Sequence, residues 1–289
     1  TRASAPLTPP YVRVSYTAVR KPSTKVLDFG STGKGPGEYA REPYIVSQEY
    51  QMGKKFLTTW DLNRFGKSIQ IANIINGNHI DFLTFKVPPV PSLQRIFMLD
   101  HTTAIVTSES PKGRAVLYDF EKNEYHWTQE HAKVKIPGVS KENRDLLDYE
   151  FLTISPQGNR IAANAHYLAR ITFYDSDFNI FKSYQKRNVL DNIRTVGDYV
   201  EWTPYTFGQI TSTYSKVYAL EHKNILINSG KDYEVKSSSI YVFSWEGNLL
   251  YKYNLDFCMR HIIVDEKTKM IYGIDREEGD IVCFPMVSD

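Results

Sequence analysis

Residues 117–127 read LYDFEKNEYHW, which is an aromatic strand, a polar turn that contains Asn123, and a second aromatic strand. Two further stretches repeat this arrangement, FYDSDFNIFKSY at 173–184 and FSWEGNLLYKY at 243–253, and IANIINGNHIDFLTF at 71–85 is a looser copy. Alternating apolar residues on both sides of a turn predict β-hairpins. Helical periodicity is almost absent, so the chain is predicted to be all-β.

A second hairpin precedes each of these, and a last one precedes the C-terminal end. The five upstream hairpins span 44–61, 95–109, 151–165, 210–222 and 261–275. Their starts lie roughly 50 to 60 residues apart, and each unit contains four short strands. Four-stranded antiparallel units at such a period are typical of the blades of a β-propeller. The sequence therefore predicts a five-bladed β-propeller.

The fifth unit lacks one strand, because the sequence ends shortly after GDIVCFPM at 279–286. The stretches VRVSYTAV at 12–19 and TKVLDFG at 24–30 precede the first full unit and supply the missing outer strand. An N-terminal strand in that place closes the ring and protects the edge of the last blade. We therefore expect one propeller domain over residues 11–289.

The segments outside the repeats are short. The spacers 129–149 and 186–205 are too short to hold a sixth blade, and SKENRDLLDYE at 140–150 is compatible with a helical turn. TRASAPLTPP at 1–10 has the composition of a disordered tether or a trimmed N-terminus whose targeting segment has been removed.

Composition excludes some partners. Lys and Arg number 35 against 33 Asp and Glu, so the formal net charge is +2, and no run of five like charges occurs. Neither nucleic acid nor an anionic membrane surface is implied as a partner. No apolar run approaches the roughly 20 residues of a membrane span, although a lipid anchor in a full-length precursor is compatible with the sequence. Cys258 and Cys283 fit buried free thiols, with a single disulfide as the alternative.

The glycine-rich stretch FGSTGKGPGEY at 29–39 superficially resembles a phosphate-binding loop around Lys34. Its spacing does not match a P-loop, and Pro36 with Gly37 would obstruct entry into the required helix. The glycines suit a turn between an outer strand and the next blade, with Lys34 and Glu38 on the wall of a binding face.

The same stretch, with Phe29, Gly30 and the pattern G-x-G-P-G-E before Tyr39, resembles the NHL-like and TolB-like propellers of exported bacterial proteins. This resemblance implies a periplasmic or cell-surface location and a role in recognition. It also implies six blades, whereas the repeats in this chain number five.

In a propeller, the loops after the second strand and the connections after the fourth strand emerge on one face, around the mouth of the central channel. We expect that face to bind a ligand, because its loops combine aromatic rings, cations and acids, a mixture suited to sugars and peptides. The candidate ligand-binding residues are Trp60, Asp61, Arg64, His166, Tyr167, Arg170, His222 and Arg276. His261, which enters an inner strand, is the other histidine expected near the channel.

No catalytic constellation stands out, since neither a G-x-S-x-G elbow nor an H-E-x-x-H motif is present. No cofactor is expected, except that calcium stays open because oxygen ligands gather on the same loops. The weak metal-ligand candidates are Asp61, Asn63, Asn164, Glu221 and Asp275. The leading hypothesis is a non-enzymatic extracytoplasmic propeller that binds a glycan, a peptide or a protein partner. The alternative is a calcium-assisted hydrolase or lyase that acts on a lactone or a sugar.

Overall fold

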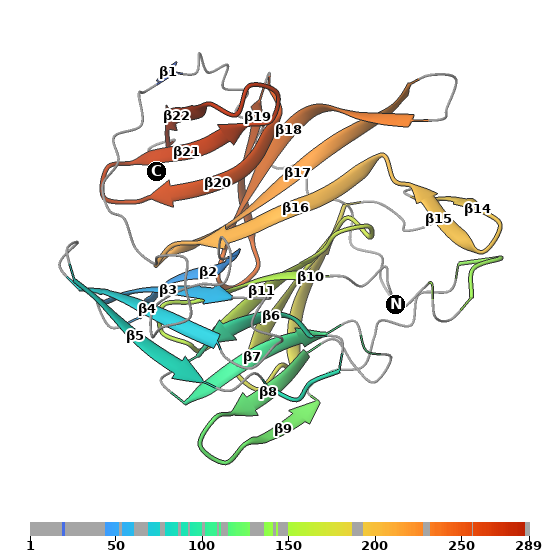
Figure 1. The fold of residues 1–289 in the computed structure, drawn as a ribbon. Helices are drawn as coiled ribbons and strands as arrows, with labels where there is room; N and C mark the ends of the chain where they lie inside the picture. The colour runs from blue at the N-terminus through green and yellow to red at the C-terminus, as the bar shows by residue number, and fades with distance from the viewer. Residues whose placement is uncertain are drawn as a thin grey trace.

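The computed structural model describes the chain over several ranges: 19–20, 44–51, 54–60, 69–75, 79–85, 88–91, 93–99, 102–108, 110, 115–127, 136–140, 143, 150–186, 193–227, 232–255 and 257–286. Within these residues the protein consists of antiparallel β-sheets, of which five have four strands (Figure 1). Both the all-β class and the five four-stranded units of the sequence prediction are confirmed. No helix in this part of the chain has the length and apolar character required to cross a bilayer.

Each of the first four sheets is a meander whose strands follow chain order. The first sheet contains β2 (Tyr44–Gln51), β3 (Lys54–Trp60), β4 (Ile69–Ile75) and β5 (His79–Phe85). The second contains β6 (Leu93–Met98), β7 (Thr103–Ser108), β8 (Ala115–Asp119) and β9 (Glu124–Trp127). The third contains β10 (Glu150–Ile154), β11 (Arg160–Ala165), β12 (Arg170–Asp175) and β13 (Ile180–Gln185). The fourth contains β16 (Tyr205–Ser212), β17 (Lys216–Ile227), β18 (Asp232–Ser244) and β19 (Leu249–Leu255).

The fifth sheet takes its fourth strand from the other end of the chain. It contains β20 (Met259–Asp265), β21 (Met270–Asp275), β22 (Ile281–Pro285) and β1 (Val19–Arg20), in the order β20-β21-β22-β1. Val19 lies opposite Cys283, and Arg20 lies opposite Val282. An N-terminal strand thus covers the edge of the last blade as the sequence predicts. Of the predicted stretch 12–19, Val19 lies in β1, and residues 12–18 lie outside the described residues.

The core consists of apolar layers between successive sheets, because alternate side chains of a strand point to opposite faces. In β11, Ile161 and Ala163 pack toward the second sheet, whereas Ala162 packs toward the fourth. In β17, Ala219 faces the third sheet and Leu220 faces the fifth. Strands buried on both faces explain why the central strands are apolar throughout. The sheets therefore stack in chain order, as blades do.

The spacer at 186–205 contains a two-stranded hairpin and no blade. Strands β14 (Arg194–Val196) and β15 (Tyr199–Trp202) pair only with each other. Gly197 in their turn has a φ of 57°, which favours glycine. The two cysteines are free thiols and both are buried, in agreement with the first of the two readings.

One strand is longer than predicted. The predicted hairpin ends at residue 222, but β17 has 12 residues and β18 has 13, and they stay paired as far as Ile227 and Asp232. Figure 1 shows these two strands projecting beyond the sheet as an arm. Asn224 anchors the base of the arm, because its Nδ2 donates to the carbonyl oxygen of Thr203 at 2.9 Å. Glu221, His222 and Asn224 in this strand are buried polar groups, and each has a hydrogen-bond or ion-pair partner.

Candidate functional site: a histidine cluster on the inner-strand bulge

The innermost strand of the fourth blade, β16, contains a β-bulge. Its pairing with β17 is regular up to Phe207 opposite Glu221 and resumes at Ile210 opposite Ala219, so Gly208 and Gln209 together face one residue. β16 also lies against β10 and β20, the inner strands of the two neighbouring blades. Bulges are frequent beside functional sites, since they redirect side chains and backbone groups.

Both neighbouring blades hold this bulge by hydrogen bonds. From the third blade, the Nδ1 of His166 lies 2.5 Å from the carbonyl oxygen of Phe207, and the Nδ2 of Asn164 donates to that of Gly208 at 3.1 Å. From the fifth blade, the backbone N–H of Ile262 donates to the Oε1 of Gln209 at 2.7 Å. Three blades therefore meet at residues 207–209.

The side chain of His222, in β17, lies directly over the bulge. It is 6% exposed. A methyl group in place of the Gly208 hydrogen would lie 2.7 Å from its Nε2, so the ring occupies the space that the missing side chain leaves. Glycine is the one residue that allows the imidazole to lie so close to the inner strand.

Ser238 connects the ring of His222 to the fifth blade. The Nδ1 of His222 lies 3.2 Å from the Oγ of Ser238, and the same oxygen accepts the backbone N–H of Met259 at 3.0 Å. The Nε2 of His222 makes no hydrogen bond to the described residues.

His166 lies in the turn after β11, and its hydrogen-bond partner fixes its tautomer. A carbonyl oxygen only accepts, so Nδ1 carries the proton and Nε2 presents a lone pair. Its ring contacts that of Tyr167 edge-on, with centroids 4.6 Å apart. Tyr167 is 37% exposed and forms an aromatic surface next to the cluster.

The electrostatic environment keeps these rings neutral. The pKa of His222 is lowered to about 4, chiefly by burial and then by the neighbouring charges of Arg276, His166 and His261, in that order. Burial also lowers the pKa of His166, against the opposing effect of the Phe207 carbonyl. At pH 7 both imidazoles are uncharged. Arg276 and His261, whose charges act on His222, are both exposed.

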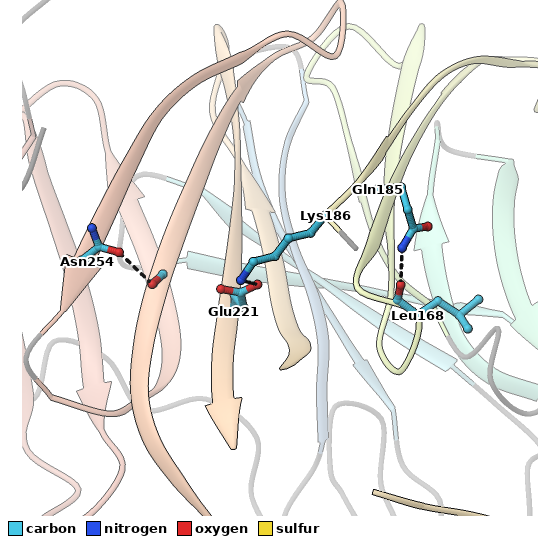
Figure 2. Close-up of polar contacts among 6 residues, drawn as sticks. Leu168, Gln185, Lys186, Glu221 and Asn254 are labelled. Carbon is cyan, nitrogen blue, oxygen red and sulfur yellow. Dashed lines mark hydrogen bonds and ion pairs between the residues drawn. The ribbon is translucent and has the colours of Figure 1, made fainter. Parts of the chain in front are cut away.

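A buried ion pair stabilises the opposite face of β17. The Nζ of Lys186, just after β13, lies 2.6 Å from the Oε1 of Glu221, and the two side chains are 16% and 3% exposed (Figure 2). The same Nζ lies 3.7 Å from the ring centroid of Tyr205. Beside it, the Nε2 of Gln185 donates to the carbonyl oxygen of Leu168 at 2.7 Å. These contacts bind the third blade to the strand that carries His222.

The predicted site residues divide into three groups. His166 and His222 both contact the bulge, Tyr167 lies against His166, and Arg276 and His261 act electrostatically on His222. Arg170 begins β12, where it lies opposite Gln185 and Ala165. The remaining predicted residues, Lys34, Glu38, Asp61 and Arg64, lie outside the described residues, as does the side chain of Trp60.

Sequence reasoning missed the residues that hold the cluster in place. Gly208, Gln209, Ser238 and Lys186 were not among the candidates. An isolated glycine within a strand pattern is a recognised signal for a bulge, so Gly208 could have been found. The other three act through partners far away in sequence and leave no local pattern.

The metal-ligand candidates in the described residues have other partners. Asn164 bonds to Gly208 and accepts the N–H of Phe151, and Glu221 pairs with Lys186. The Oδ1 of Asp275 accepts the N–H groups of Glu277 and Glu278 in its own turn. Across the described residues, no three His, Cys, Asp or Glu side chains are arranged to hold a metal ion. Asp61 and Asn63 lie outside this part of the chain.

Several solved structures are distantly similar to this chain. A member of the DUF4221 family from Bacteroides vulgatus shares 9% identity over 94% of this chain and 96% of its own, with a TM-score of 0.49. The Cps50 (Swd1) β-propeller domain of Myceliophteria thermophila shares 11% identity over 84% of both chains, with a TM-score of 0.41. BamB from Moraxella catarrhalis shares 10% identity over 85% of this chain and 86% of its own, with a TM-score of 0.39. No family model and no curated protein matches the chain. Likenesses this low say nothing about ligand or partner.

Proposed function

We propose that this propeller is a non-enzymatic binding protein that takes a glycan, a peptide or a protein partner on the face where the histidine cluster lies. The observation that carries this proposal is the meeting of three blades at one inner-strand bulge, where His166 contacts Phe207, His222 packs over Gly208 and Ile262 binds Gln209. The charges of Arg276 and His261 act on His222 from the fifth blade. Such a cluster combines hydrogen-bond donors, an acceptor and a positive charge, with an exposed aromatic ring beside it. Ligand sites in proteins commonly have this combination.

Binding is favoured over catalysis because the hydroxyl that contacts His222 among the described residues is buried. Ser238 is 2% exposed, and its Oγ contacts the Nδ1 of His222. Nucleophilic catalysis needs the hydroxyl within reach of both a base and the substrate. The calcium-assisted hydrolase has no supporting observation in the described residues, since its three candidates there are held by protein groups.

An extracytoplasmic location is part of the proposal and depends on the resemblance of the glycine-rich stretch at 29–39 to exported propellers. Fractionation of the native host, with an antibody against the chain, tests it separately from ligand binding. Recovery in the soluble cytoplasmic fraction would remove this part of the proposal alone.

A panel of ligands tests the binding function. Purified protein is applied to arrays of oligosaccharides and peptides, and hits are checked by thermal shift, because a ligand specific for the native state raises its melting temperature. The double variant His166→Ala, Tyr167→Ala is expected to lose the response. Lys122→Ala, in the exposed turn of the second blade, is the control and should respond like the wild type. Equal binding by the double variant would place the site elsewhere and refute the proposal.

A further inference from the structure

The outer strand of the fourth blade carries two polar side chains that face the third blade. In the pairing of β19 with β18, Lys252 lies opposite Tyr241 and Asn254 lies opposite Ser239. Tyr241 belongs to the apolar layer between the third and fourth sheets, so Lys252 and Asn254, two residues apart, share this face of the sheet. Tyr253, between them, packs toward the fifth sheet. A cation and an amide therefore lie next to each other where the two blades meet.

The ammonium group of Lys252 has no anionic partner in the described part of the chain. Its Nζ lies 5.0 Å from the ring centroid of Tyr241, and it makes neither a hydrogen bond nor an ion pair with a described residue. Glu221, the acid that acts on Lys252, is already bound by the Nζ of Lys186 at 2.6 Å. The two ammonium groups and the one carboxylate together leave one positive charge unbalanced.

This positive charge is partly removed from solvent. Lys252 is half-buried, and burial lowers the pKa of its ammonium group, against the opposing effect of Glu221. The Nζ of Lys186 lies 5.7 Å from the centroid of the same Tyr241 ring, so a second cation is close by. A cation that has lost part of its hydration without gaining an anionic partner is costly, and an anion bound there would offset that cost.

Asn254 supplies a second donor beside this charge. Its Oδ1 accepts the hydroxyl of Ser239 at 3.3 Å, so its Nδ2 points away from Ser239 (Figure 2). This nitrogen makes no hydrogen bond to a described residue. Lys252, Asn254 and Ser239 are all partly exposed, so solvent reaches the group. An amide N–H donor beside an unbalanced ammonium group is the chemistry that holds an oxyanion, through charge-assisted hydrogen bonds.

The types of donor favour a phosphate group as this oxyanion. A carboxylate is matched best by the planar fork of an arginine, whereas lysine binds phosphate as a point charge. A phosphate group has close to two negative charges and three acceptor oxygens at neutral pH. These oxygens are sufficient to accept from Lys252 and from Asn254 at the same time.

We propose that Lys252 and Asn254 bind a phosphate group at the junction of the third and fourth blades. The site is separate from the histidine cluster, because His222 lies on the opposite face of the fourth sheet from Glu221 and Tyr241. It therefore does not depend on the proposed binding function of that cluster.

Calorimetric titration of the full chain at constant ionic strength tests the proposal. Inorganic phosphate and glucose 6-phosphate are expected to bind, and acetate and glucose are not. Tighter binding of glucose 6-phosphate would identify a phosphorylated molecule as the source of the group, and otherwise the source is free phosphate. Acetate binding as tight as that of phosphate would overturn the ligand class. Absence of binding by both phosphate probes would overturn the proposal.

Three variants locate the contact. Lys252→Gln is expected to weaken phosphate binding by about ten- to hundredfold, the usual loss for a hydrogen bond to a charged group. Lys267→Gln removes the same charge from an exposed turn of the fifth sheet and should bind like the wild type. Asn254→Asp keeps an oxygen for Ser239 and places a carboxylate beside Lys252, so this variant should fold and no longer bind phosphate. Wild-type affinity in either Lys252→Gln or Asn254→Asp would overturn the location.

Discussion

Gly208 shows how a single missing side chain creates the site. The imidazole of His222 fills the place of a Cβ, and the inner strand bulges there, so histidine and glycine depend on each other. Neither residue by itself predicts this contact from the sequence. The contact arises because the pairing of β16 with β17 shifts at the bulge.

We predict that Gly208→Ala lowers the free energy of unfolding by about 1 to 3 kcal/mol, the usual effect of overpacking a filled space. The added methyl would displace the His222 ring, whose Nε2 would lie 2.7 Å away. Urea denaturation measures the loss. In a His222→Ala background the same substitution should be nearly neutral, and an additive double mutant would show that the two groups do not compete for space.

The lowered pKa of His222 predicts that the folded protein loses stability in acid. Its pKa is about 4 in the folded protein, below the ordinary value of about 6.5, so the unfolded chain binds the proton more readily. Its contribution is therefore complete above pH 6.5 and is lost as the pH falls through 4. The buried ring accounts for roughly 3 kcal/mol over this window, and His166 adds in the same direction.

Denaturation midpoints between pH 7 and pH 4 measure this effect. In His222→Gln the fall in stability with decreasing pH is expected to be shallower than in the wild type. Identical pH profiles for the two proteins would mean that other groups cause the acid sensitivity.

Strand β17 connects the site to the third blade, because one of its faces carries His222 and the other carries Glu221. His222 points toward the cluster, and Glu221 points toward the third blade, where Lys186 neutralises it. Strand alternation alone imposes this division. The ion pair thus sets the position of the strand from which His222 projects.

Breaking this ion pair should be costly. Lys186→Ala leaves Glu221 buried without its charge partner, which destabilises proteins by about 3 to 5 kcal/mol. The double variant Lys186→Met, Glu221→Leu removes both charges and is expected to lose much less. Urea denaturation of the single and double variants gives the coupling energy.

The exposed pair of Lys122 and Asp119, 3.0 Å apart, serves as the control. Lys122→Ala should produce no measurable change, since solvent screens a pair of this kind. A loss in Lys186→Ala no larger than in Lys122→Ala would show that the buried pair does not fix β17.

The hairpins could be predicted from the sequence because their determinants are local, namely alternation and a turn residue such as Asn123. The arm formed by β17 and β18 could not, because Glu221 and Asn224 look like loop residues until their partners on other strands are known. The same holds for the site. His166, His222 and Arg276 were identified as separate rim residues, but their convergence depends on the stacking of three blades.

At the scale of the whole molecule, a strand from the N-terminal part of the chain completes the last sheet. In this sheet Val19 lies opposite Cys283. The apolar layers between the second, third, fourth and fifth sheets join units that are neighbours in sequence. The pairing of β1 with β22 instead links residues from the beginning of the sequence to residues near its end.

Removal of residues 1–20 is expected to expose the edge of β22, because an unpaired edge strand offers free N–H and C=O groups to other chains. Hydrogen exchange should then be faster across Ile281–Pro285, and size-exclusion chromatography should show self-association. Removal of residues 1–10 alone leaves β1 in place and should preserve slow exchange. If both truncated proteins exchange at the same rate in β22, the N-terminal strand does not protect the last blade. Because β20 of that blade carries His261, loss of β1 should also weaken ligand binding at the cluster.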